Sequence, residues 1–123
     1  MSNPIDRYKR FIDDLVALRP CVSSQWILEG RRWAEINNDP QDKAINTLVE
    51  TLNEEQKQTF AMMLDHAYDA GIHDTLSYLD DASTEGLRIC QEGDALPIEP
   101  FDTPMHYDFI CRCEDDQWPD ETI

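Results

Sequence analysis

The chain has 123 residues, of which 41% are hydrophobic and three are tryptophans. This length and composition predict a folded chain and exclude wholesale disorder. Its 10 basic and 26 acidic residues give a formal net charge of −16. Such a charge repels nucleic-acid phosphates and anionic lipid headgroups, so we expect no direct binding to nucleic acid or to a membrane.

The negative charge is concentrated in the second part of the chain. Residues 1–50 hold seven basic and eight acidic groups, whereas residues 51–123 hold three basic and eighteen acidic groups. The corresponding net charges are −1 and −15. A concentrated negative field attracts basic protein surfaces or metal cations. Simple solubility is the alternative explanation, and the sequence leaves both open.

The beginning of the chain lacks the apolar core of a signal peptide. No apolar run approaches the ~20 residues that a membrane-spanning helix needs. We therefore expect a cytoplasmic protein with its four cysteines reduced.

Residues 1–82 carry the signals of about five helices. Asn3 and Pro4 suit the cap and the first position of a helix, which is predicted over residues 4–18. A shorter second helix is predicted to run from Ser23 or Ser24 through Trp26 and Trp33. The two indoles would then share one helix face, either in the core or with one of them as an exposed anchor.

Two further start signals predict the remaining helices. Asp39 and Pro40 begin one helix, and Asn53 with Gln56 forms a near capping box for the next. Gly71 suits the end of that helix, so a separate last helix is expected after it. The predicted buried faces consist of Ile45, Leu48, Val49 and Leu52 on the first of these helices, and Phe60, Met63, Leu64 and Ala67 on the second.

The sequence pattern changes after Gly86. Residues 87–90 and 95–98 flank a turn containing Gly93 and predict a hairpin, and residues 107–113 could add a third strand. The expected fold is therefore α+β and mainly α, with about five helices followed by a small C-terminal β-hairpin or three-stranded sheet. We expect a single domain over residues 1–123, with a helical part (1–82), a small β part (83–113) and an acidic tail (114–123).

Three segments carry a resemblance to a known family. They are Gly71-Ile72-His73-Asp74, Leu96-Pro97-Ile98-Glu99-Pro100-Phe101 and Tyr107-Asp108-Phe109-Ile110-Cys111-Arg112-Cys113-Glu114. They resemble a family of small acidic bacterial proteins of unknown function, over most of the chain. The resemblance implies helices followed by a small β end, and a bacterial source. It implies no activity, cofactor or partner.

Two groups of residues are candidate metal ligands: His66 with His73, and His106 with Cys111 and Cys113. Neither has the tightly paired spacing that is typical of zinc sites. Partly exposed histidines and inert cysteines are therefore the expected interpretation, and no cofactor is predicted. The sequence also contains no nucleophile elbow, phosphate-binding glycine loop or His-Glu-x-x-His motif, so no enzyme is predicted.

The acidic tail is the predicted partner-binding site. Charges steer encounter, while a desolvated aromatic residue slows dissociation. Trp118 is either such a contact residue or a pin that holds the tail on the domain. The predicted site residues are Glu114, Asp115, Asp116, Trp118, Asp120 and Glu121.

The function expected from this site is non-enzymatic binding of a basic protein partner. An immunity protein, an antitoxin or a nucleic-acid-mimicking inhibitor of a toxin or nucleic-acid enzyme would have this property. An accessory protein without an inhibitory role is the alternative, followed by a metal-binding protein or a small enzyme.

Overall fold

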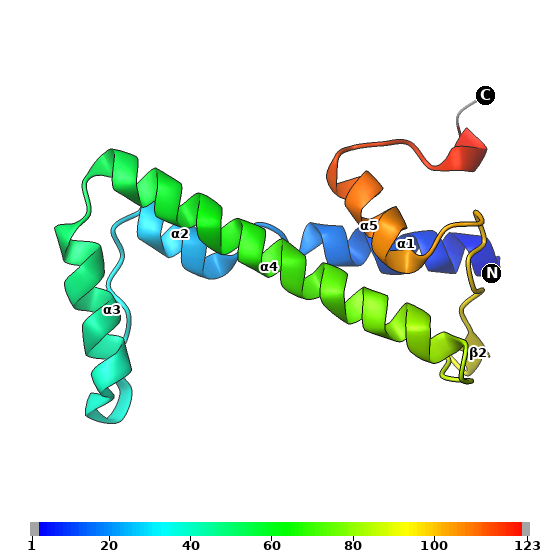
Figure 1. Ribbon diagram of the computed structural model, residues 1–123, viewed down its shortest axis with the longest axis horizontal. Coiled ribbons are helices and arrows are strands. Elements are labelled where there is room, and N and C mark those ends of the chain that lie inside the picture. The colour runs from blue at the N-terminus through cyan, green and yellow to red at the C-terminus, as the bar shows by residue number, and fades with distance from the viewer. Residues whose placement is uncertain (1–2, 122–123) are drawn as a thin grey trace. The chain divides into compact units, whose positions relative to one another are not determined.

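A computed structural model describes residues 3–121, and its fold is mainly helical with a small two-stranded sheet (Figure 1). Within these residues, four α-helices precede the hairpin, where the sequence predicts about five. They are α1 (Pro4–Ala17), α2 (Val22–Leu28), α3 (Pro40–Thr51) and α4 (Glu54–Ser83). The later elements are β1 (Cys90–Gln91), β2 (Asp94–Ala95) and α5 (Met105–Cys113), with short 3-10 helices η1 (Ile36–Asn38) and η2 (Pro119–Glu121).

Contacts divide the chain into two compact units. The first contains the described parts of residues 1–19 and 70–123, and the second contains residues 20–69. The single domain predicted over residues 1–123 stays a prediction, and the end of the predicted tail, Thr122 and Ile123, lies outside the described residues. No described helix has both the length and the hydrophobicity needed to cross a membrane.

Three predicted helix starts are confirmed by their caps. The Asn3 side chain accepts a hydrogen bond from the Asp6 N–H at 2.8 Å, and Asp39 accepts one from the Gln41 N–H at 2.9 Å. Asn53 and Gln56 form a reciprocal capping box, with distances of 2.9 and 2.8 Å.

The predicted break at Gly71 is wrong, because α4 continues through this residue as one 30-residue helix. The Gly71 carbonyl accepts a hydrogen bond from the Thr75 hydroxyl at 2.8 Å, and Gly71 does not have the positive φ of a helix-ending glycine. An interior glycine lowers helix stability by only about 1 kcal/mol relative to alanine, which neighbouring helix formers can offset.

The third strand predicted over residues 107–113 is also wrong, because these residues belong to α5. Its first turn is capped by Asp80 on α4, whose two carboxylate oxygens accept the Met105 and His106 N–H groups at 3.0 and 3.1 Å. The hairpin itself is confirmed but short, with Cys90 opposite Ala95. Its two turn residues, Glu92 and Gly93, both have positive φ, as a tight hairpin turn requires.

In the second unit, α2 ends at Leu28 and does not reach Trp33. The Trp26 and Trp33 rings nevertheless make an edge-to-face contact at 5.3 Å. The buried Asn46 side chain holds the irregular segment by bonding both the N–H and the carbonyl of Trp33, at 2.7 and 2.9 Å. The predicted buried faces are only partly correct: Val49 is buried, whereas Ile45, Leu48, Met63 and Ala67 are exposed.

The core of the first unit forms where α5 packs against α1 (Figure 1). Its buried residues come from α1, α4, α5 and the segment after α5, and are Tyr8, Ile12, Leu76, Phe109 and Trp118. Trp118 of the predicted tail is therefore part of this core.

Candidate functional site

Trp118 is buried in the first unit, with 3% of its surface exposed. Its indole stacks on the Phe101 ring at a centroid distance of 5.3 Å, and the Tyr8 ring meets it edge-on at 6.1 Å. Burial of so large an aromatic side chain stabilises the fold by removing apolar surface from water. Trp118 thus occupies the position of a pin, and its ring is not exposed to a partner.

A cluster of Asp13, Arg112 and Trp118 fixes the segment after α5. The Asp13 carboxylate accepts hydrogen bonds from Arg112 Nε at 2.8 Å, Arg112 Nη2 at 3.3 Å and Trp118 Nε1 at 3.3 Å. The guanidinium lies over the indole, 5.1 Å from its centroid, and Nη1 donates to the Asp116 carbonyl at 2.7 Å. Residues 112–118 are therefore tied to α1 at several points.

The predicted carboxylates fall into two groups. Asp120 and Glu121 are about half exposed and form ion pairs with Lys9 of α1, at 2.8 and 3.4 Å. Glu114, Asp115 and Asp116 are exposed directly after α5. We call these last three residues the acidic turn.

The acidic turn closes α5 as a Schellman motif. The Asp116 N–H donates to the Cys111 carbonyl at 3.0 Å, the Asp115 N–H donates to the Arg112 carbonyl at 3.2 Å, and Asp115 has a φ of 62°. Glycine is usual at this left-handed position, and cations rather than anions are favoured at a helix C-terminus. The three consecutive carboxylates go against the charge preference of a helix C-terminus, and Asp115 also goes against the preference for glycine.

A buried carboxyl group links α5 to α1 below this surface. Asp108 is 5% exposed and accepts hydrogen bonds from the hydroxyls of Tyr8 and Thr103. Burial raises the pKa of Asp108, while the two hydroxyl donors act in the opposite direction. The pKa of Tyr8 is raised as well, first by burial and then by its bond to Asp108. We assign these groups to the core, because every one of these contacts is internal.

The candidate metal ligands do not assemble into a site. His106 Nδ1 lies 2.8 Å from Asp80, and His73 Nδ1 lies 3.1 Å from its neighbour Asp74. The rings of His73 and His106 meet edge-on at 5.1 Å. Within residues 3–121, no three side chains of His, Cys, Asp or Glu are arranged to hold a metal ion. The cysteines are free thiols.

A groove of about 480 Å³ lies beside the acidic turn, where α5 meets the segment that follows it. Tyr107, Cys111, Asp116, Gln117 and Trp118 are among its lining residues, and we call it the α5 groove. Small-molecule sites typically measure about 300–1,000 Å³, so the groove has the size of a binding site.

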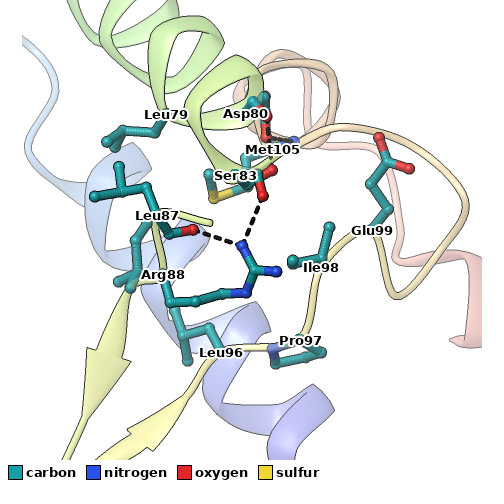
Figure 2. A pocket seen from close by; sticks show the side chains of 11 residues that line it. Leu79, Asp80, Ser83, Leu87, Arg88, Leu96, Pro97, Ile98, Glu99 and Met105 are labelled. Atoms are coloured by element: carbon teal, nitrogen blue, oxygen red, sulfur yellow. Dashed lines mark hydrogen bonds between the residues drawn. The ribbon is translucent and has the colours of Figure 1, made fainter. Parts of the chain in front are cut away.

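A second pocket in the same unit surrounds Arg88 with apolar side chains from α4, the loop before β1 and residues 96–98 (Figure 2). Arg88 Nη1 donates to the carbonyls of Ser83 at 2.6 Å and Leu87 at 2.8 Å. Ser83 is the last residue of α4, and its carbonyl also accepts the Gly86 N–H at 3.2 Å, so Arg88 adds a second donor at this helix end. The cavity volume of about 30 Å³ is room for a single water, which indicates a structural role.

Comparison with known proteins places the chain in a family. The sequence profile of a family of unknown function, DUF6547, matches residues 1–120, and the chain belongs to this family. The family resemblance inferred from the sequence is thereby confirmed, but nothing in the match bears on a bacterial source or on an acidic character of the family. No curated protein and no solved structure matches the chain.

Proposed function

We propose that the protein is a non-enzymatic binding protein whose acidic turn docks on a basic surface of a partner protein. The observation that carries the proposal is the placement of three carboxylates, Glu114, Asp115 and Asp116, at the C-terminal end of α5, with Asp115 in the left-handed conformation. Local preferences of the chain are most often overridden where function requires a particular side chain.

The anchoring of the turn also supports the proposal. Trp118 and the Arg112–Asp13 pair hold the chain immediately after α5 in one conformation. A binding surface that is ordered before the encounter loses less conformational entropy on association. The acidic turn is therefore better suited to specific docking than a flexible acidic tail would be.

The charge of the surrounding unit favours a basic partner. Residues 1–19 and 70–123 together hold 17 acidic and six basic groups, a net charge of −11. Such a field accelerates the approach of a cationic surface. A cleft that normally receives phosphates is cationic, so the proposed partners are toxins or nucleic-acid enzymes that an immunity protein, antitoxin or inhibitor blocks.

The test begins with capture of the partner from source cells on the immobilised protein, at low and moderate salt. Association and dissociation rates of the captured partner are then measured for the wild type and for a Glu114→Gln/Asp115→Asn variant. We expect the variant to associate several-fold more slowly and with a flatter salt dependence, at a nearly unchanged dissociation rate.

The matched control is Glu54→Gln/Glu55→Gln, which removes two exposed charges from the first turn of α4 in the other unit. It should leave the association rate close to that of the wild type. Equal slowing by both variants would mean that total charge, not the acidic turn, steers the encounter. Unchanged rates in both variants would refute the proposed docking surface.

A further inference from the structure

The α5 groove is lined by an exposed carboxylate, Asp116, and by an arginine whose charge is already paired. The charge of Arg112 is paired inside the protein, because its guanidinium donates two hydrogen bonds to the Asp13 carboxylate. It donates a third to the Asp116 carbonyl. The Asp116 side chain lines the groove and is exposed. Within residues 3–121, its carboxylate accepts no hydrogen bond, whereas its backbone carbonyl accepts one from Arg112 and its backbone N–H donates one to the Cys111 carbonyl.

Nearby carboxylates contribute to the pKa shifts of two titratable groups in the groove, Tyr107 and Cys111. The pKa of the Tyr107 phenol is raised, first by its hydrogen bond with the Cys111 thiol and further by the charges of Asp116 and Asp108. Burial raises the pKa of the Cys111 thiol; the hydrogen bond with Tyr107 acts in the opposite direction, and the charges of Asp116, Asp108 and Glu114 raise the pKa further. A thiol held protonated is a poor nucleophile. Cys111 is therefore a weak nucleophile, and the exposed Asp116 carboxylate attracts cations to the groove.

We propose that the α5 groove receives one arginine side chain of the basic partner, with Asp116 as its ion-pair acceptor and the Tyr107 ring as its stacking surface. This assignment rests on the proposed function and names the residue that the partner supplies. Tyr107 is 54% exposed, so its ring is accessible from solvent. The groove shares Asp116 with the acidic turn, so a basic segment that docks on the turn lies next to the groove.

Arginine fits this groove better than lysine or an anion does. A guanidinium is planar, stacks on aromatic rings and donates several hydrogen bonds in fixed directions, whereas an ammonium is a strongly hydrated point charge. The Gln117 amide at the rim adds an acceptor oxygen for those donors. An anion would meet Asp116 and the acidic turn, and would find Arg112 already paired with Asp13.

The test uses the blocked tripeptide acetyl-Gly-Arg-Gly-amide as a probe, titrated into the full chain and followed by ¹⁵N NMR. The three indole N–H signals provide a built-in control, because Trp118 lines the groove whereas Trp26 and Trp33 lie in the other unit. We expect a saturable shift of the Trp118 signal alone. The citrulline peptide, which has the same shape without the charge, should bind roughly tenfold more weakly.

Two substitutions test the assigned contacts. Tyr107→Ala should weaken the arginine peptide roughly two- to fivefold by removing the stacking surface, and Asp116→Asn should weaken it by a similar factor. The matched control is Tyr78→Ala, which removes a tyrosine that is 69% exposed on α4 and should leave the affinity unchanged. With the captured partner, Tyr107→Ala should raise the dissociation rate and leave the association rate unchanged.

Several outcomes would overturn the inference. They are an absence of saturable binding, equal binding of the lysine or citrulline peptide, and equal effects of Tyr107→Ala and Tyr78→Ala. If the peptide fails while Glu114→Gln/Asp115→Asn still slows partner association, the groove assignment is wrong and the proposed function stands. If the peptide binds but Glu114→Gln/Asp115→Asn does not change the association rate of the partner, the proposed function is wrong. The assignment of the groove to that partner is then wrong as well.

Discussion

Asp115 occupies a backbone conformation that glycine adopts more readily, because a φ of 62° brings an L-residue's Cβ close to its own chain. Its charge also opposes the negative end of the α5 dipole. Asp115→Gly should therefore stabilise the fold by about 1 kcal/mol, measured as the free energy of unfolding in urea. If the acidic turn is functional, the same variant should associate more slowly with its partner.

The control for this prediction is Asp116→Gly, which removes the same charge one residue later. Asp116 does not have a positive φ, so glycine brings no relief of strain there and adds flexibility to the unfolded chain. This variant should be no more stable than the wild type. If both glycine variants lose stability to the same extent, Asp115 is not a strained position.

Asp108 predicts a pH-dependent contribution to stability. Its pKa is raised in the folded state, chiefly by burial, so the folded protein binds this proton more tightly than the unfolded chain does. The stabilisation is then fully present below about pH 4, the ordinary range of a carboxyl group, and is lost as the pH rises through the raised pKa.

Asp108→Asn keeps the shape of the side chain and removes this titration. The wild type should therefore lose stability relative to the variant as the pH rises from about 4 towards neutrality. Urea denaturation of both proteins across this range measures the difference. A difference in unfolding free energy that stays constant with pH would show that Asp108 does not titrate abnormally.

At the scale of the elements, the sequence predicted those structures whose signals are local. The caps at Asn3 and at Asn53 act on N–H groups only three residues away, so the pattern alone placed α1 and the start of α4. The local pattern of residues 107–113 also allows a third strand, and the cap that begins α5 at Met105, Asp80, lies 25 residues earlier. No window of sequence around residues 105–113 contains that signal.

The candidate site was predictable to the same limited extent. The run of carboxylates was visible in the sequence, and so was the choice for Trp118 between a pin and a contact residue. The pairing of Arg112 with Asp13 spans 99 positions, and the groove depends on how α5 and the following segment pack. Local patterns do not encode such contacts, so Tyr107 was not among the predicted residues.

Asp80 provides a direct test of this distant cap. Asp80→Ala leaves the Met105 and His106 N–H groups without their acceptor, and should destabilise the first unit by about 1 kcal/mol, within the usual range for cap removal. Hydrogen exchange should accelerate most at the first turn of α5. Asp81→Ala, at the adjacent exposed position on α4, is the matched control and should leave these amides protected.

At the scale of the whole molecule, the first unit combines the nearly neutral beginning of the sequence with its strongly acidic last part. Two cations of α1 pair with acids from much later in the chain: Arg7 with Asp94, and Lys9 with Asp120 and Glu121. The nearly neutral first part of the sequence therefore offsets some of the charge of the last part. The carboxylates of the acidic turn are not among the partners of these two cations.

The net charge of −16 also predicts how salt affects the melting temperature. Self-repulsion destabilises a compact state of such charge, whereas exposed ion pairs contribute only about 0–1 kcal/mol each. Screening by salt should therefore weaken the self-repulsion more than it weakens the ion pairs. The melting temperature at pH 7 should then rise with NaCl. Most of the rise should occur between about 0.01 and 0.15 M, where the Debye length falls from about 30 to 8 Å.

Near the sequence pI of about 4.2, the same salt should change the melting temperature far less, because repulsion is small there. A melting temperature that falls with salt at pH 7 would show that the ion pairs of α1 outweigh the repulsion.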